Sequence, residues 1–513
     1  MTTLRELAQR FGIEVSTRAP GELWSEIPEE QFTGWVAAIA AAAVLADLFA
    51  TTGDGEPSLT AVFQVRGDPE WLTVRCRLSG DSFASITPFI HAASWYEREI
   101  REMHGLEPVG HPLPARLRLH DWPEGQPPMR APVDERLGAG PGIPERVPMV
   151  RGRGVFQIPL GPVRSGPQES GEFLFDSGGE DLVAVSPLLG YKFRAIERLA
   201  EGRTVEQGLL LAERLAGVSA FANGLAFVQA AERALGISVD DGARRARTLM
   251  NELERLHNHF GDIGRLADAT GLLVAGAQYA ALKEEVLRRC ADLTSHRYLR
   301  GALALGGLAA PLSPAELRTL GRDVPRWRRR SRRLQAVLED TGTFTDRLET
   351  TAFLRPRHAA QHNLVGPIGR STGADRDCRR DHPYAAYDRV AFEVPVRSEG
   401  DALARLGIRL AEVQQSLAIV EQVLDSWPLA TTGGGGAPGE APGSALGWSE
   451  GAGGETLHWV EVTPEGRVAR WRARPAALVN WHVYADACAS GNNLTDYPVI
   501  EASFALSHAE FDR

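Results

Sequence analysis

The sequence has only four cysteines in 513 residues, and none of them forms a Cys-x-x-Cys pair. Cys76, Cys290, Cys378 and Cys488 lie far apart, so zinc or iron–sulfur sites built from local cysteine pairs have no support, and neither has a disulfide framework. Basic residues are in the minority, because 56 Lys and Arg face 66 Asp and Glu and leave a net charge of -10. This balance argues against general nucleic-acid binding, which needs a basic surface.

Long apolar runs are also missing. Residues 1–10 lack the apolar core of a secretory signal. The most apolar stretch, Trp35–Ala50, is interrupted by Asp47 and is shorter than the roughly 20 residues that span a bilayer. No Gly-x-Gly-x-x-Gly follows a predicted strand, so we expect no dinucleotide site. We therefore expect a cytoplasmic protein, peripheral to the membrane, whose membrane contact is indirect and made through partner subunits.

Length and pattern predict several units rather than one. Residues 1–120 mix strands and helices. Leu59–Val65 and Leu72–Leu78 alternate as two half-buried strands, and Ala93–Met103 has helical spacing that ends at Gly105.

The rest of the chain divides by composition. Residues 121–154 are rich in proline and glycine and have little periodicity, which predicts a linker. Residues 155–513 are mostly helical with some strands. Inside them, residues 429–455 are again rich in glycine and proline and predict a flexible loop rather than a boundary.

Residues 249–265 are the most informative stretch. They predict one long helix with an apolar stripe at Leu249, Leu253, Leu256, Phe260 and Ile263. A second stripe is ionisable, at Glu252, Arg255, His259 and Asp262. Such a stripe usually faces solvent. The alternative is that both faces are covered and the charges are internal and paired, and periodicity alone leaves the two interpretations open.

The same stretch carries a resemblance to a known family. Glu-Leu-Glu-Arg-Leu-His-Asn-His at 252–259, followed by Gly-Asp-Ile-Gly, resembles the large subunit of membrane-bound [NiFe] hydrogenases such as the formate hydrogenlyase large subunit, and the homologous 49 kDa subunit of respiratory complex I. Glu97-Arg-Glu, Gly105 and Gly110-His-Pro resemble the 30 kDa subunit of complex I. The resemblance implies an α+β fold: a small α/β domain, then a mainly helical-bundle domain with β elements.

The resemblance also implies where a metal centre would be. In hydrogenases of this type two Cys-x-x-Cys pairs hold nickel and iron, because these metals suit soft thiolates. Here Ala216, Ser219, Ser507 and Glu510 stand at the four cysteine positions, so we expect no NiFe centre and no metal there. Catalytic residues stay unassigned, and the candidates for lining the altered cavity are Arg194, Glu197, Ser219, Ser507 and Glu510.

Cofactors and partners follow from the same resemblance. The final Glu510–Arg513 resembles the end of the complex I subunit, whose cavity holds a quinone head group, but Val205 stands where that family has a tyrosine. Quinone binding therefore stays open. An iron–sulfur cluster is expected in a partner, the small subunit. We expect a large subunit, not active alone, of a membrane-associated oxidoreductase complex of the formate hydrogenlyase or NADH dehydrogenase type. The alternative is a non-catalytic structural or coupling subunit.

Two smaller features stay ambiguous. His358 and His362 have the four-residue step of two metal ligands on a helix, but no third ligand is evident, and a solvated pair is the competing interpretation. Glu97, Glu99 and Glu102 form either a solvated helix face or a structural contact, and we favour the contact.

Overall fold

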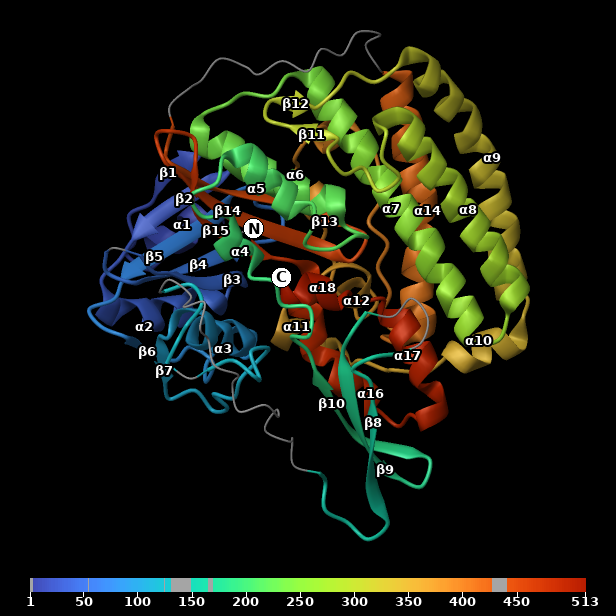
Figure 1. Ribbon diagram of the computed structural model, residues 1–513, viewed down its shortest axis with the longest axis horizontal. Helices are drawn as coiled ribbons and strands as arrows, with labels where there is room; N and C mark the ends of the chain where they lie inside the picture. Colours follow the sequence, from blue (N-terminus) through green and yellow to red (C-terminus); the bar gives the residue numbers. More distant parts are fainter. Residues whose placement is uncertain (1–2, 54, 124, 131–148, 165–168, 427–440) are drawn as a thin grey trace.

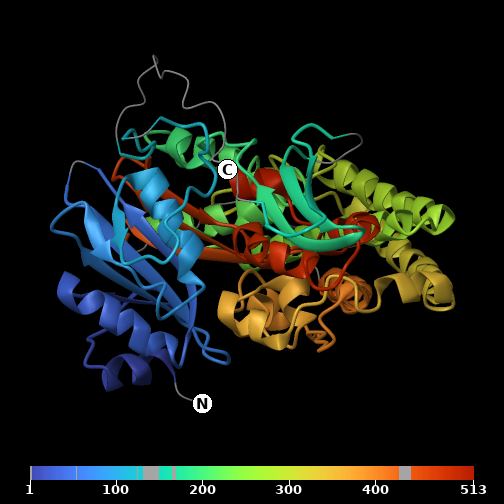
Figure 2. The same ribbon diagram turned by 90° about the horizontal axis from the view of Figure 1, so that it is seen from below.

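The computed structural model describes residues 3–53, 55–123, 125–130, 149–164, 169–426 and 441–513. These residues form a small α/β unit at one end of the molecule and a larger unit of helices and short sheets, which confirms the predicted α+β class (Figure 1). Seen from below, the small unit and the long helices α8 and α9 lie at opposite ends (Figure 2). No described helix combines the length and the hydropathy that crossing a bilayer requires.

The N-terminal unit is built on a five-stranded sheet. Its strand order is β1-β2-β5-β4-β3, with β2 and β5 parallel and the other neighbours antiparallel. The expected helix is present as α3, and Gly105 ends it in the left-handed region with a φ of 66°. The elements are α1 (Leu4–Arg10), β1 (Ser16–Ala19), β2 (Glu22–Glu26), α2 (Glu29–Ala40), β3 (Val44–Thr51), β4 (Ser58–Gln64), β5 (Trp71–Arg77), β6 (Ser82–Ala84), α3 (Ala93–His104) and β7 (Glu107–Val109).

Strand β4 is buried on both faces. Leu59, Ala61 and Phe63 belong to the core that α2 covers, whereas Val62 belongs to the core of the large unit. The prediction of a half-buried strand is therefore wrong for β4. Its physical reason is that the second face of the sheet packs against the large unit instead of water.

The large unit contains a bundle of long helices that lie side by side (Figure 1). The bundle helices are α7 (Asp241–Ala269), α8 (Leu273–Thr294), α9 (Pro314–Glu339) and α14 (Ala402–Asp425). The shorter helices of this unit are α4 (Ile196–Ala200), α5 (Val205–Ala212), α6 (Ala220–Leu235), α10 (Gly342–Leu348), α11 (Pro356–His362), α12 (Gly366–Arg370), α13 (Cys378–Asp381), η1 (Tyr387–Arg389), α15 (Ala476–Asn480), η2 (Trp481–Val483), α16 (Tyr484–Cys488), η3 (Leu494–Asp496), α17 (Tyr497–Phe504) and α18 (His508–Asp512).

Among its described residues, the large unit also has three small antiparallel sheets. One has the order β10-β9-β8, one pairs β11 with β12, and one has the order β13-β14-β15. The strands are β8 (Val155–Leu160), β9 (Glu172–Gly178), β10 (Asp181–Leu188), β11 (Leu303–Ala304), β12 (Gly307–Leu308), β13 (Ser444–Gly451), β14 (Gly454–Val462) and β15 (Val468–Arg474).

The predicted loop 429–455 is partly a hairpin, because β13 and the start of β14 lie in it. All eight residues of β13 are buried, so the strand has no polar face and gives no alternating pattern. Its glycines mark close packing instead: a Cβ on Gly447 would collide with the backbone of α6 at Ala226 and Ala230. The loop prediction is thus wrong for residues 444–455, while residues 427–440 lie outside the described residues. So do residue 124 and residues 131–148 of the predicted linker.

Helix α7 settles the question of the ionisable stripe. Glu252, Arg255 and His259 are each at most 1% exposed, so the interpretation with internal, paired charges is correct. His259 Nε2 lies 2.7 Å from Glu412 Oε2 on α14, and Arg255 pairs with Glu252 and Glu412. The helix packs against α8, α14 and β13, so its ionisable stripe is covered.

Polar contacts fasten the two units together. Asp47 in β3 accepts hydrogen bonds of 3.1 and 2.9 Å from Arg472 in β15, and Glu22 accepts one of 2.9 Å from the backbone N–H of Leu446. Glu99 in α3 is 3% exposed and forms ion pairs with Arg118, Arg472 and Arg513.

The other two carboxylates of α3 are also engaged in structural contacts. Glu97 accepts hydrogen bonds from two hydroxyls and the Ile86 N–H, and Glu102 accepts from the N–H of Leu117 and Arg118. The three glutamates are therefore structural contacts rather than a solvated face.

Candidate functional site

A cavity of about 480 Å³ lies where the amino end of α6, the carboxyl half of α7 and the C-terminal segment meet. Its ionisable or hydroxyl-bearing lining residues are Ser219, Asp262, Arg265, Asp268, Lys283, Tyr298, Arg409, Thr456, Ser507 and Glu510. Its apolar lining includes Val218, Ile368, Phe504 and Leu506. A concave site of this size with a few polar groups is typical of small-molecule binding.

Ser219 and Glu510 meet directly in the wall of this cavity. Ser219 precedes α6 but does not cap it; its hydroxyl donates a hydrogen bond of 2.7 Å to Glu510 Oε1. Asn223 Nδ2, one turn into α6, donates to the same oxygen at 3.0 Å. Burial raises the pKa of Glu510, and these donors only partly offset that effect.

Ser507 holds Glu510 from the other side. It is the N-cap of α18, where its hydroxyl accepts the backbone N–H of Glu510 at 3.1 Å. The same hydroxyl donates to Glu169 at 3.0 Å. Ser219, Ser507 and Glu510 are therefore linked to one another in the cavity wall, and Glu169 is attached to them through the Ser507 hydroxyl.

Arg194 and Glu197 do not line the cavity, although the sequence pointed to them. Arg194 donates to the carbonyl oxygens of Arg214, Leu215 and Ala509 at 2.7 to 2.9 Å, and so ties the segment before Ala216 to the segment that carries Glu510. Its guanidinium therefore binds backbone carbonyl groups and positions the two segments that carry cavity-lining residues.

Glu197 lies in a different buried cluster. It accepts the N–H of Ala473 at 2.8 Å and pairs with Arg513 at 3.1 Å. Ala216, the remaining position of interest, is 1% exposed and has no donor atom in its side chain.

Glu254, which the sequence did not single out, is a second carboxyl group behind the cavity. It accepts the N–H groups of Phe221 and Ala222 at the start of α6, at 2.6 and 2.9 Å. Burial nevertheless raises its pKa to about 8, and the nearby charge of Glu510 adds to the rise. At neutral pH this site therefore favours a protonated Glu254, a carboxyl group able to release a proton.

The cavity also contains opposite charges that the sequence did not place in a site. Burial opposes ionisation of Asp262, but Arg265 and Arg409 together hold its pKa below the usual range. Burial lowers the pKa of Lys283, which faces the same space. The polar stripe of α7 could have indicated Asp262 and Arg265. Lys283 and Arg409 come from α8 and α14 and had no local signal.

Next to the cavity lies a buried network of ion pairs. Arg370 pairs with Glu412 and with Glu450, the latter at 2.9 Å, and Arg379 pairs with Asp377 at 2.7 Å and Glu252 at 3.2 Å. The Arg370 guanidinium overcomes burial and holds the pKa of Glu412 well below its usual range. This network fixes α7, α12, α13 and α14 against one another.

The fold and the cavity together define a class of protein: a small α/β unit joined to a helical unit with a polar cavity beside its central helix. Comparison with protein families agrees with this division. Residues 27–136 match the 30 Kd subunit of respiratory-chain NADH dehydrogenase, residues 194–262 match nickel-dependent hydrogenase, and residues 271–435 match the 49 Kd subunit of respiratory-chain NADH dehydrogenase.

Whole-chain relatives combine the same units. The chain is 30% identical over 464 residues to formate hydrogenlyase subunit 5 of Escherichia coli (strain K12), covering 87% of this chain and 80% of the relative. It is 32% identical over 455 residues to hydrogenase-4 component G of the same strain, covering 86% and 78%. The chain therefore belongs to the family of fused 30 kDa-type and 49 kDa/hydrogenase-type large subunits.

Two more distant similarities agree with this assignment. The C/D fusion protein of NADH-quinone oxidoreductase from Bacteroides thetaiotaomicron is 28% identical over 363 residues, covering 67% of this chain and 68% of the relative. A chain of the membrane-bound sulfane sulfur reductase, an archaeal respiratory membrane complex, superposes with a TM-score of 0.65 at 24% identity, covering 70% of this chain and 99% of that one. At that identity the superposition shows the fold alone.

Proposed function

We propose that this chain is the large subunit of a membrane-associated electron-transfer complex of the formate hydrogenlyase or NADH:quinone oxidoreductase type, working without a NiFe centre. The observation that supports the proposal is the cavity wall of a chain with the family's fold, in which Ser219, Ser507 and Glu510 supply hydroxyl and carboxyl oxygens.

The donor set does not fit a nickel–iron cluster. Such a cluster needs four soft thiolates, whereas Ala216 offers no ligand atom and the other three positions offer hard oxygen donors. Those oxygens also satisfy one another, through the bonds from Ser219 to Glu510 and from Glu510 N–H to Ser507. A cluster would have to break this set as well as bind to it.

A quinone head group or a similarly small redox substrate suits the cavity better. Its wall offers cationic donors in Lys283 and Arg265 and an apolar side in Phe504. Hydrogen-bond donors beside an apolar wall are what a flat carbonyl compound requires. Glu254, whose pKa burial raises to about 8, lies behind the wall and would supply a proton to a reduced product.

Electrons would reach this cavity from an iron–sulfur cluster in a docked small subunit, because the described part of the chain has no cysteine group that could hold one. Exposed apolar side chains near the cavity support a docking face: Val218 lines it and is 43% exposed, and Leu273 and Val274 precede the lining residue Gly276 and are 65% and 77% exposed. In this proposal the chain lies on the cytoplasmic face of the membrane and is held there by partner subunits.

A non-catalytic coupling subunit is the second candidate. The favouring observation is the dense buried charge network around Arg370 and Arg379, which fixes the bundle rigidly and contacts no solvent. Such a network would suit a rigid subunit that transmits motion between partner subunits and does not itself catalyse a reaction.

Purification of the tagged chain with its partners from native membranes, followed by metal and quinone analysis, separates these functions. Bound quinone and an iron–sulfur partner without nickel are expected from the redox proposal. The iron–sulfur partner without quinone would favour the coupling subunit, and one nickel per chain would overturn both.

A variant that fills the cavity tests whether quinone binds there. Ser219→Leu projects a bulky side chain into the cavity and should remove quinone while the partner subunits still co-purify. Ser79→Leu makes the same change at an exposed position of the N-terminal unit and should leave both unchanged. Equal quinone content in the two variants would contradict the cavity as the binding site.

A further inference from the structure

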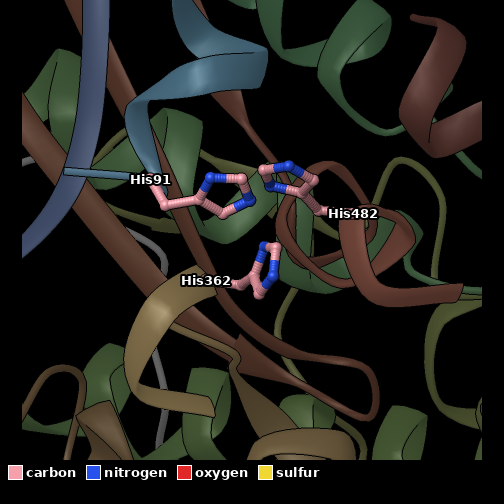
Figure 3. Close-up of side chains that lie close together, drawn as sticks. All are labelled: His91, His362 and His482. Carbon is pink, nitrogen blue, oxygen red and sulfur yellow. The ribbon is translucent and has the colours of Figure 1, made fainter. Parts of the chain in front are cut away.

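Three histidines from distant parts of the sequence meet at the boundary between the two units. His91 lies just before α3, His362 is the last residue of α11, and His482 is in η2. One ring nitrogen from each lies within 4.8 Å of the other two. Figure 3 shows the three rings facing one common space from three separate elements. Within the described residues, no other group of three or more His, Cys, Asp or Glu side chains converges in this way.

The packing of the rings makes the arrangement specific. His362 stands nearly perpendicular to both neighbours, at 86° to His91 and 82° to His482, with centroid distances of 4.6 and 4.3 Å. His91 and His482 are stacked at 5.1 Å. Trp95, in the first turn of α3, stacks on His482 at 4.7 Å and fixes the orientation of that ring.

One ring of the three has a free ligand atom. His362 is 6% exposed, and its Nδ1 is buried without a hydrogen-bond partner. A buried ring nitrogen without a partner needs an explanation, and binding to a metal ion is a common role of imidazole nitrogens.

Nearby cations do not occupy this space. Arg98 is the cationic neighbour that acts on His482, but its guanidinium is bound to the carbonyl oxygens of Ala115 and Arg116 at 2.7 and 2.5 Å. His358, the other histidine of α11, accepts the N–H of Arg355 through its Nδ1 at 3.2 Å and is not one of the three.

We propose that His91, His362 and His482 form a zinc site, with Zn²⁺ bound by three imidazole nitrogens and a fourth position open to solvent beside the exposed His91. Tetrahedral Zn²⁺ with bonds of about 2.0–2.1 Å needs ligand nitrogens roughly 3.3 Å apart. The 4.8 Å limit therefore requires each pair of nitrogens to approach by no more than about 1.5 Å. Rotation of the exposed His91 ring supplies this movement for the two pairs that include His91, while His362 and His482 approach each other by rotations of their own rings.

The site is independent of the cavity and of the proposed function, since none of the three histidines lines that cavity. It joins the start of α3 in the small unit to α11 and η2 in the large unit. Bound Zn²⁺ thus clamps the two units together at a place outside the oxygen-lined wall.

Titration of the purified full-length chain with Zn²⁺ against a competing chelator tests the proposal, with Co²⁺ absorption as a second readout of tetrahedral coordination. We expect one site per chain. His91→Gln should weaken Zn²⁺ binding at least about tenfold, and because His91 is exposed the variant should keep its fold. His482→Gln should do the same, while His358→Gln, a matched change on α11, should bind like the wild type.

Three results would overturn the zinc site: no binding by the wild type, binding that survives in both His91→Gln and His482→Gln, or a Co²⁺ spectrum typical of six-coordinate ions. In each case the three rings are a packing cluster only. Zn²⁺ should also raise the thermal midpoint of the wild type and of His358→Gln but not of His91→Gln.

Discussion

The hydroxyl of Ser219 donates a hydrogen bond of 2.7 Å to the carboxyl of Glu510, across 291 residues of sequence. This contact joins the start of α6 to the C-terminal helix α18 and closes one wall of the cavity. In the family resemblance both positions belong to metal ligands. Here they are each other's partners, which gives the wall a structural role that needs no metal.

Ser219→Ala should destabilise the chain by about 1–3 kcal/mol, because it leaves a buried carboxyl oxygen with one donor fewer. The cost should grow as pH rises, since the lost hydroxyl stabilises the ionised form of Glu510. Thermal midpoints at pH 5.5, 7 and 8.5 measure both effects. Ser331→Ala removes a buried hydroxyl whose partners are uncharged, and its cost should not vary with pH. A pH-independent loss in Ser219→Ala would contradict the assignment.

Glu254→Gln should flatten the dependence of stability on pH. The native pKa of Glu254 is about 8 against an ordinary 4.5, so between these values the folded chain holds a proton that the unfolded chain releases. Stability therefore falls as pH rises from about 4.5 to 8, by a few kcal/mol at most from this group. The Gln variant cannot titrate. It should be less stable than the wild type at pH 5, because Gln places a donor against a backbone N–H, and should lose this disadvantage by pH 8.5.

Glu206→Gln controls for the loss of a carboxylate at an exposed site of α5. It should follow the wild-type pH profile. If Glu254→Gln follows that profile too, Glu254 is ionised in the native state and is no proton donor.

Glu99→Gln should cost roughly 3–5 kcal/mol, because it leaves Arg118, Arg472 and Arg513 buried with one anion fewer. The loss should appear as weaker attachment of the small unit, seen as faster proteolysis or hydrogen exchange at the boundary between units. Glu107→Gln breaks the ion pair between Glu107, whose side chain is 50% exposed, and Arg101, whose side chain is 40% exposed. This variant should change stability by less than about 1 kcal/mol. Similar effects from the two variants would mean that the buried cluster does not hold the units together.

Gly447→Ala should destabilise the large unit by more than about 2 kcal/mol, because the new Cβ meets backbone atoms of α6 that cannot rotate away. Gly34→Ala, in the exposed part of α2 with open space around it, should be neutral or stabilise by up to about 1 kcal/mol. Denaturant midpoints of the two variants check the contrast. A mild effect of Gly447→Ala would show that β13 can move away from α6.

Sequence patterns were most reliable where one local rule acted alone. The spacing at Ala93–Met103 and the glycine at 105 placed α3 correctly, because helical periodicity and a left-handed cap are properties of a few adjacent residues. The pattern of residues 249–265 likewise gave α7 but could not say whether its charges were covered. That depended on Glu412 and Arg379, which lie more than 120 residues away in the sequence.

The errors came from burial on two faces. The alternation of β4 predicted a solvent-facing side, but that side packs against the large unit. The glycine-rich sequence of β13, which is covered on both sides, carries no alternation that could reveal a buried strand. The glycine content of β13 predicted a loop, but Gly447 lies in a strand and lacks a side chain that would collide with α6.

By itself, the sequence determined the motifs that resemble the family, the order of the two units and the absence of thiolates at Ala216, Ser219, Ser507 and Glu510. These properties depend only on which residues occur and in what order. Tertiary structure alone decided which of them share a wall, that Arg194 and Glu197 stand outside it, and that His91, His362 and His482 converge. Such contacts depend on packing between segments hundreds of residues apart, and local periodicity carries no information about that packing.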